Sequence, residues 1–258
     1  INRFIPGPTA DLPIRIYRPH HNENAPAILY FHGGGFVLNF LDIYDASLSR
    51  LANQSQCVVI SVQYQKAPEH PFPIPFDDCY STFVWVRENA GKLNINPELI
   101  AIAGDSAGAT LASAVAIKAR DNHIGIPLQL LIYPCNGINF ETDSYKDFAE
   151  GYGLTTRAMK WFWEQYLQGD SHNDNPYAVP MSAPSLEGVA PALIVAAPFD
   201  PLFSDGQLYA EKLRRDGVDV TYKSFDGMNH GFVTNMGVTP MARTAIDWMA
   251  GEVRKVMA

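Results

Sequence analysis

The sequence is poor in cysteine and in positive charge, and it contains no long apolar run. Its three cysteines, Cys57, Cys79 and Cys135, are odd in number and lack the spacing of a metal site. The 19 Lys and Arg are outnumbered by 27 Asp and Glu, and the formal net charge of -8 argues against nucleic acid or an anionic membrane as a partner. No apolar stretch is long enough to span a bilayer. Two of the cysteines lie in apolar surroundings, which indicates buried, reduced thiols, so we expect a cytoplasmic protein.

Internal repeats and low-complexity linkers are also absent. The 258 residues, 47% of them hydrophobic, are enough for one large core. Short apolar runs alternate with helical patterns along the chain, which is typical of an α/β fold with a mostly parallel central sheet flanked by helices. We predict a single domain over 1–258, with strands over 12–17, 27–31, 57–62, 99–103, 129–133, 192–197 and 218–225, the first of them at an edge of the sheet. Helices are predicted over 42–53, 75–89, 109–119, 155–167, 204–216 and 240–256.

Residues 136–191 interrupt this alternation. The segment is rich in aromatic side chains, and its one clear helix can begin after Thr155 as an N-cap. We expect an insertion packed over the strand ends, whose aromatic residues either fill the core or line an apolar pocket. The last helix is amphipathic, and its inward side is expected to carry Met241, Ala245, Trp248, Met249 and Val253.

Three histidines in loops are poor candidates for chemistry. His20 and His21 are adjacent in a polar turn with no further ligand nearby in the sequence, so a solvated loop is favoured over a metal site. His70 lies among prolines and is not expected to act as a base. The sequence therefore predicts neither a metal site nor a cofactor.

A serine stands where the strand over 99–103 turns into a helix. Ser106 is flanked by Gly104 and Gly108 at G-x-S-x-G spacing. A nucleophile in a strained turn needs neighbours without side chains, so that strand and helix can pass closely. The helix N-terminus also directs free N–H groups at any negative charge that develops nearby. The alternative is an ordinary strand–helix turn with Ser106 as the N-cap.

A run of three glycines follows the strand over 27–31. In His32-Gly33-Gly34-Gly35, backbone N–H groups are exposed without side chains to block approach, which is what an oxyanion hole requires. A flexible turn is one alternative. A phosphate-binding loop is another, although the Walker Lys-Ser/Thr and the G-x-G-x-x-G pattern are both missing.

Ser106, Asp200 and His230 each follow a predicted strand, so all three are expected at one edge of the sheet. A serine hydroxyl needs a histidine to accept its proton, and that histidine needs a carboxylate to fix its tautomer. Asp205 is the rival carboxylate, but it is expected in the first turn of a helix, where the dipole already favours it. Asp105 adjoins the serine and is interpreted as structural.

Five motifs together resemble the hormone-sensitive-lipase-like family of bacterial carboxylesterases, within the α/β-hydrolase fold. They are His32-Gly33-Gly34-Gly35-Phe36, Ala67-Pro68-Glu69-His70-Pro71-Phe72-Pro73, Gly104-Asp105-Ser106-Ala107-Gly108, Asp200-Pro201-Leu202, and Gly227-Met228 with His230-Gly231-Phe232. The resemblance covers nearly all of the chain. It implies that Ser106 is the nucleophile and that Asp200 and His230 complete the triad.

The same resemblance assigns the residues around the serine. It implies that the N–H groups of Gly34, Gly35 and Ala107 form the oxyanion hole. His32 and Gly33 would support that loop, with His32 transferring no proton. The implied activity is hydrolysis of short-chain acyl esters through an acyl-enzyme, with no metal or cofactor.

Two departures from the family pattern stand out. Gln65 and Lys66 replace an Arg and a Leu, a change expected to affect a structural salt bridge and not the triad. The family's N-terminal cap helices would precede Ile1 and are not part of this sequence, so we expect 136–191 to form a partial helical cap over the site.

Two other functions remain open at this level. Plant gibberellin receptors resemble the family and bind a ligand without catalysis, but they have lost the catalytic histidine that His230 supplies here. An amidase would use the same machinery on a different acyl compound. The last strand and helix also permit a homodimer, although core packing explains the same apolar pattern.

Overall fold

The computed structural model describes residues 1–19 and 24–258, so the loop predicted at His20 and His21 lies outside the described residues. Within them, eight strands form one sheet in the order β1-β2-β4-β3-β5-β6-β7-β8. The strands are β1 (Asn2–Pro6), β2 (Asp11–Tyr17), β3 (Ala25–Phe31), β4 (Val58–Val62), β5 (Ile95–Asp105), β6 (Gln129–Ile132), β7 (Ala192–Ala196) and β8 (Val220–Ser224). Only β2 runs antiparallel to its neighbours, so the mostly parallel α/β sheet is confirmed.

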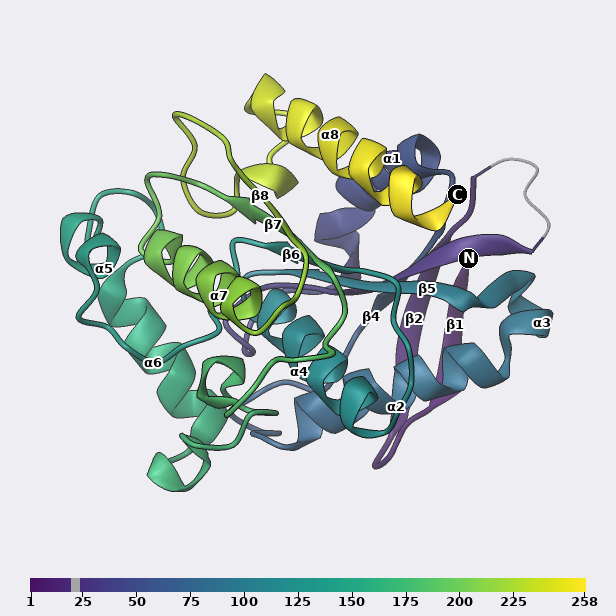
Figure 1. Cartoon of the computed structure of the whole chain (residues 1–258), viewed down its shortest axis with the longest axis horizontal. Coiled ribbons are helices and arrows are strands. Elements are labelled where there is room, and N and C mark those ends of the chain that lie inside the picture. The colour runs from purple at the N-terminus through teal and green to yellow at the C-terminus, as the bar shows by residue number, and fades with distance from the viewer. Residues whose placement is uncertain (20–23) are drawn as a thin grey trace.

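Helices cover both faces of this sheet (Figure 1). The longer ones are α1 (Asp45–Ser55), α2 (Ile74–Glu88), α4 (Ala107–Asp121), α6 (Thr156–Leu167), α7 (Phe203–Arg215) and α8 (Pro240–Met257). Alternate side chains of β3 point to opposite faces. Ile28 and Tyr30 pack with residues of α1 and α8, while Leu29 and Phe31 pack with residues of α2, α4 and α7. The sheet is therefore packed between two apolar layers. This packing fixes the position of the edge at which β3, β5, β7 and β8 end.

The shorter elements lie in the connections. They are the 3-10 turns η1 (Leu41–Tyr44), η2 (Asp170–His172), η3 (Pro180–Ser182) and η4 (Phe232–Thr234), and the short helices α3 (Ala90–Leu93) and α5 (Asp143–Asp147). The segment 136–191 joins β6 to β7 and contains α5 and α6. As predicted, Thr155 caps α6, since its hydroxyl accepts the N–H of Ala158 at 3.1 Å.

The prediction that 12–17 forms an edge strand is wrong. β2 lies between β4 and β1, and β1 is the strand at that edge. β1 was not recognised in the sequence, because Ile5 is its only buried residue and Phe4 is 74% exposed. A strand with one buried side chain lacks the alternation by which strands are recognised.

Several boundaries also differ from the prediction. β5 continues past Ala103, because Gly104 pairs with Phe31 and Asp105 with Ile132. The helix predicted from 42 begins as the 3-10 turn η1. In α8, Met241 and Trp248 are only partly buried, and the inward face is carried by Ala242, Ala245, Ile246, Met249, Ala250, Val253 and Met257.

Two further expectations concern thiols and membranes. All three cysteines are buried and free. Among the described residues, no helix combines the length and the apolar character needed to cross a bilayer.

Gln65, one of the two departures from the family pattern, faces a buried carboxylate. Asp78 of α2 is fully buried, and it accepts the backbone N–H of Gln65 at 2.8 Å and its Nε2 at 3.2 Å. None of the ion pairs within the described ranges includes Asp78. Burial raises the pKa of this carboxyl, against the opposing effect of the Gln65 hydrogen bonds. The folded protein therefore holds a buried acid without an ion-pair partner among the described residues.

We expect the substitution Gln65→Arg to stabilise the protein at neutral pH. Because the folded-state pKa of Asp78 is raised, this carboxyl favours folding in acid, and that contribution is lost as the pH rises through the folded-state value. An arginine would pair with the charged form and raise the free energy of unfolding by about 1 kcal/mol at pH 7. The gain should shrink near pH 4, roughly where an unfolded Asp titrates.

Urea unfolding at the two pH values measures this effect. Gln54→Arg at a half-exposed position of α1 is the matched control, because it adds the same charge on the opposite face of the sheet from Asp78. A gain of equal size at both pH values, or an equal gain in the control, would contradict the explanation.

Candidate active site

Ser106 occupies the turn between β5 and α4 in a conformation that is rare for a residue with a side chain. Its backbone has φ 53° and ψ -125°, and its N–H donates to the carbonyl of Ile132 at 2.8 Å. The side chain makes no capping hydrogen bond to α4, so the reading of Ser106 as an ordinary N-cap is wrong. Strain of this kind persists where the surroundings enforce it, and it is concentrated at functional sites.

The two flanking glycines are required by crowding, as predicted. A Cβ on Gly108 would lie 2.0 Å from the carbonyl oxygen of Phe31, and one on Gly104 would lie 2.3 Å from the carbonyl of Gly108. Both clashes are with backbone atoms, which cannot rotate away. Strand β5 and helix α4 can therefore pass β3 only where side chains are missing.

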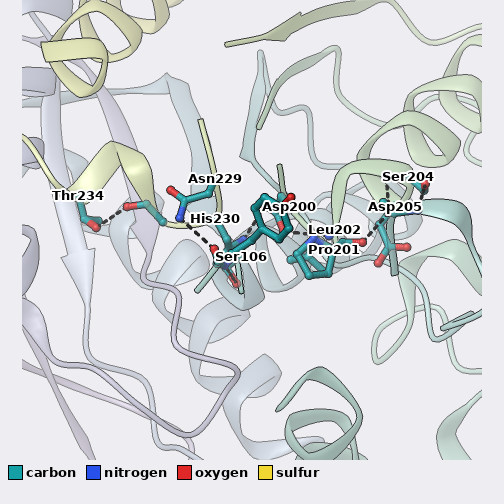
Figure 2. Close-up of polar contacts among 12 residues, drawn as sticks. Ser106, Asp200, Pro201, Leu202, Ser204, Asp205, Asn229, His230 and Thr234 are labelled. Carbon is teal, nitrogen blue, oxygen red and sulfur yellow. Dashed lines mark hydrogen bonds and ion pairs between the residues drawn. The ribbon is translucent and has the colours of Figure 1, made fainter. Parts of the chain in front are cut away.

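The structure brings Ser106, His230 and Asp200 into one hydrogen-bonded row (Figure 2). His230 Nε2 lies 3.0 Å from Ser106 Oγ, and His230 Nδ1 lies 2.7 Å from Asp200 Oδ2. Asp200 is fully buried, and its Oδ1 accepts the N–H of Leu202 at 2.9 Å. The carboxylate is therefore fixed from both sides, and the imidazole can exchange a proton with the hydroxyl.

The rival carboxylate, Asp205, does not join this row. Its Oδ2 lies 3.3 Å from the hydroxyl of Tyr145, and burial raises its pKa well above the ordinary value. In Figure 2 it lies on α7, beyond Leu202 from His230. Asp205 joins α7 to α5 and makes no contact with the imidazole.

The loop that carries His230 is held by residues the sequence did not suggest. The side-chain amide of Asn229 donates to the carbonyl of Tyr152 at 2.9 Å, and the N–H of Phe199 donates to the carbonyl of Met228 at 3.0 Å. The ring of Tyr133 lies 4.7 Å from the imidazole, centroid to centroid. These partners come from three separate connections, so no local pattern could have found them.

The glycine run after β3 forms a loop beside Ser106. Gly34 and Gly35 have φ of 120° and 60°, and their N–H groups meet no acceptor within the described part of the chain. A Cβ on Gly35 would lie 2.3 Å from the ring of Phe162, so α6 packs directly on this loop. Ala107, the first residue of α4, adjoins the serine from the other side.

His32 stays away from the proton-transfer row. It is fully buried and stacks on Tyr64 with ring centroids 4.4 Å apart. Burial lowers its pKa to about 4, so the ring is neutral at physiological pH and its Nδ1–H donates to the carbonyl of Gly33 at 2.8 Å. His32 thus lies beneath the glycine loop and contacts its first residue, Gly33.

Asp105 connects the serine turn to the glycine loop. Its Oδ1 accepts the hydroxyl of Tyr30 at 2.8 Å and the N–H of Gly33 at 2.9 Å, and its Oδ2 accepts the hydroxyl of Tyr44 at 3.1 Å. Burial raises the pKa of this carboxyl, while its three donors oppose the rise. The structural interpretation of Asp105 therefore agrees with its contacts.

A cavity of about 320 Å³ opens over these groups. It is lined by Gly34, Gly35, Leu38, Asn39, Ile43, Tyr44, Asp105, Ser106, Leu154, Met159, Phe162, His230, Gly231 and Thr234. Leu154, Met159 and Phe162 come from the 136–191 segment, whereas His70 does not line the cavity. No cluster of His, Cys, Asp and Glu among the described residues is suited to hold a metal ion.

Comparison with known proteins agrees with this geometry. A family model described as the alpha/beta hydrolase fold matches residues 28–234. The chain is 40% identical over 237 residues to the carboxylic ester hydrolase LipN of Mycobacterium tuberculosis, covering 89% of this chain and 63% of that protein. It is 34% identical over 224 residues to an arylesterase of Saccharolobus solfataricus, covering 86% of this chain and 73% of that protein.

Solved structures give the same result in three dimensions. The thermostable carboxylesterase EstE1, cloned from a metagenomic library, superposes with a TM-score of 0.96 at 37% identity, over 100% of this chain and 89% of that one. The esterase of the archaeon Pyrobaculum calidifontis superposes with a TM-score of 0.95 at 38% identity, over 99% and 82%. The chain therefore belongs to the hormone-sensitive-lipase-like carboxylesterase family of the α/β-hydrolase fold.

Proposed function

We propose that the protein is a serine carboxylesterase that hydrolyses short-chain acyl esters through an acyl-enzyme. The observation that carries the proposal is the hydrogen-bonded row in which His230 lies 3.0 Å from Ser106 and 2.7 Å from Asp200. The names of the relatives, a carboxylic ester hydrolase and an arylesterase, support ester hydrolysis as the reaction class. The cavity of about 320 Å³ favours small acyl groups.

Acylation begins when His230 Nε2 removes the proton from Ser106 Oγ as this oxygen attacks the ester carbonyl. The carbonyl π electrons move to its oxygen, which the N–H groups of Gly34, Gly35 and Ala107 would stabilise. When the tetrahedral intermediate collapses, the bond to the alcohol oxygen breaks and His230 returns the proton to the leaving alcohol.

Deacylation repeats these steps with water. His230 takes a proton from the water as its oxygen attacks the acyl carbon, and it returns this proton to Ser106 Oγ as the acid leaves. Asp200 keeps the proton on His230 Nδ1 and stabilises the imidazolium in both halves of the reaction. Each donor of the oxyanion hole contributes about 3 kcal/mol of barrier lowering in comparable enzymes.

A fluorophosphonate probe tests this proposal directly. The activated serine should displace fluoride, so intact-protein mass spectrometry should show one covalent adduct per chain and peptide mapping should locate it at Ser106. The unmodified protein should hydrolyse p-nitrophenyl acetate and butyrate faster than esters of long acyl chains. Absence of both labelling and hydrolysis would favour a non-catalytic binding protein, and faster cleavage of a matched anilide than of the ester would favour an amidase.

A further inference from the structure

The loop over 33–39, which we call the oxyanion loop, has an unusual backbone with a strained position at Phe36. Gly34, Gly35, Phe36 and Asn39 all have positive φ, of 120°, 60°, 65° and 73°. Glycine accepts this conformation readily and asparagine tolerates it, but the side chain of Phe36 disfavours it. Such a loop keeps its shape only where external contacts hold it.

Asn39 closes the oxyanion loop on its own beginning. Its Nδ2 donates to the carbonyl of Gly33 at 3.1 Å and to the hydroxyl of Tyr44 at 3.4 Å. The same hydroxyl accepts the N–H of Gly33 at 3.0 Å and donates to Asp105 Oδ2 at 3.1 Å. The amide of Asn39 therefore ties the end of the loop to the network beneath the serine turn.

Lys66 fixes Asn39 from outside the loop. Its Nζ donates to the carbonyl of Asn39 at 2.9 Å. Lys66 is half-buried, and burial lowers the pKa of its ammonium group. None of the ion pairs across residues 1–19 and 24–258 involves Lys66. The cation is thus directed at a loop carbonyl and has no carboxylate partner.

The segment that carries Lys66 contacts the loop at one further point and the chain just beyond the loop at another. The N–H of Ala67 donates to the carbonyl of strained Phe36 at 3.0 Å, and Gln63 Oε1 accepts the N–H of Leu41 at 3.1 Å. Of these three contacts, only the one from Lys66 has a charged donor. Hydrogen bonds from charged donors are stronger than neutral ones, so this contact contributes most to holding the loop.

We infer that Lys66 and Asn39 are positioning residues of the oxyanion hole, which keep the N–H groups of Gly34 and Gly35 aimed at the reacting oxygen. The inference rests on the proposed function. Contacts to the oxyanion strengthen only as charge develops in the transition state. Loosening the loop should therefore lower kcat and leave KM nearly unchanged.

Steady-state kinetics on p-nitrophenyl butyrate test the inference. Lys66→Met keeps the length of the side chain and removes the ammonium, and it should lower kcat about tenfold with KM within about twofold of wild type. Lys66→Arg should restore most of kcat, because a guanidinium can also donate to the Asn39 carbonyl. Lys212→Met on α7, whose side chain is also half-exposed, is the matched control and should leave both constants unchanged.

A second variant covers the possibility that Lys66→Met does not fold. Asn39→Gly permits the same positive φ and deletes only the amide, so it should reproduce the loss in kcat while the protein stays folded. Unchanged kcat in the folded variants, or a rise in KM alone, would overturn the inference. Fluorophosphonate labelling of the wild-type protein reports on Ser106 independently of the loop. If the wild type is labelled and the variants are fully active, this inference is wrong and the proposed function stands. If the wild type is neither labelled nor active, both the proposed function and this inference are wrong.

Discussion

Replacing Ser106 with alanine is expected to reduce kcat for p-nitrophenyl butyrate by about four to six orders of magnitude. The hydroxyl oxygen forms the covalent bond to the acyl group, and His230 at 3.0 Å has no other nucleophile to activate within the row. Spectrophotometric assay of p-nitrophenol release, with circular dichroism to verify folding, measures the effect. The variant should also fail to react with the fluorophosphonate.

Ser61 supplies a matched control for this experiment. It is a fully buried serine of β4 whose hydroxyl finds no hydrogen-bond partner among the described residues. Ser61→Ala deletes the same atom from the same sheet and should leave kcat within about twofold of wild type. Substantial hydrolysis by a folded Ser106→Ala variant would refute the assignment of the nucleophile.

The exchange of Asp200 for asparagine should lower kcat by about four orders of magnitude. An amide can donate to His230 Nδ1 and so favour the tautomer that carries its proton on Nε2, which cannot accept the proton of Ser106. The packing should survive, because asparagine has nearly the same shape as aspartate and its Oδ1 can still accept the N–H of Leu202. Single-turnover acylation, followed as the burst of p-nitrophenol, separates this effect from product release.

The same substitution at Asp205, the rival carboxylate, shows whether the loss of activity is specific to Asp200. Asp205→Asn removes an equally buried acid only five positions along the chain. Asparagine has nearly the same shape as aspartate, and burial already disfavours the charged form of Asp205 by raising its pKa, so the amide is a close replacement. We expect kcat within about threefold of wild type. A large loss in Asp205→Asn together with a small one in Asp200→Asn would reverse the assignment of the two carboxylates.

Local sequence patterns were informative wherever chemistry and chain geometry depend on neighbouring residues. The G-x-S-x-G spacing predicted a crowded turn, and the backbone atoms 2.0 and 2.3 Å from the missing Cβ positions explain it. The position of Ser106, Asp200 and His230 after strands predicted a shared sheet edge, because parallel strands end together. The contact between Asp200 and His230, at 2.7 Å, lies at that edge.

Contacts between distant segments were missed. The strand β1 escaped notice because pairing with β2 is its main support and only Ile5 is buried. Tyr44 and Asn39 showed no motif, although both bond to the base of the oxyanion loop. Lys66 was noticed only as a departure from a family pattern, and its partner could not be inferred.

The sequence by itself determined the fold class, the order of the serine, aspartate and histidine, and the glycines that crowding demands. These depend on residue type and on the nearest few neighbours in the chain. Only the tertiary structure decided which contacts fix Asp200 and His230 in place and which residues hold the strained loop beside Ser106. Those choices depend on hydrogen bonds between segments tens of residues apart, whose partners meet only after the sheet and both helical layers have packed.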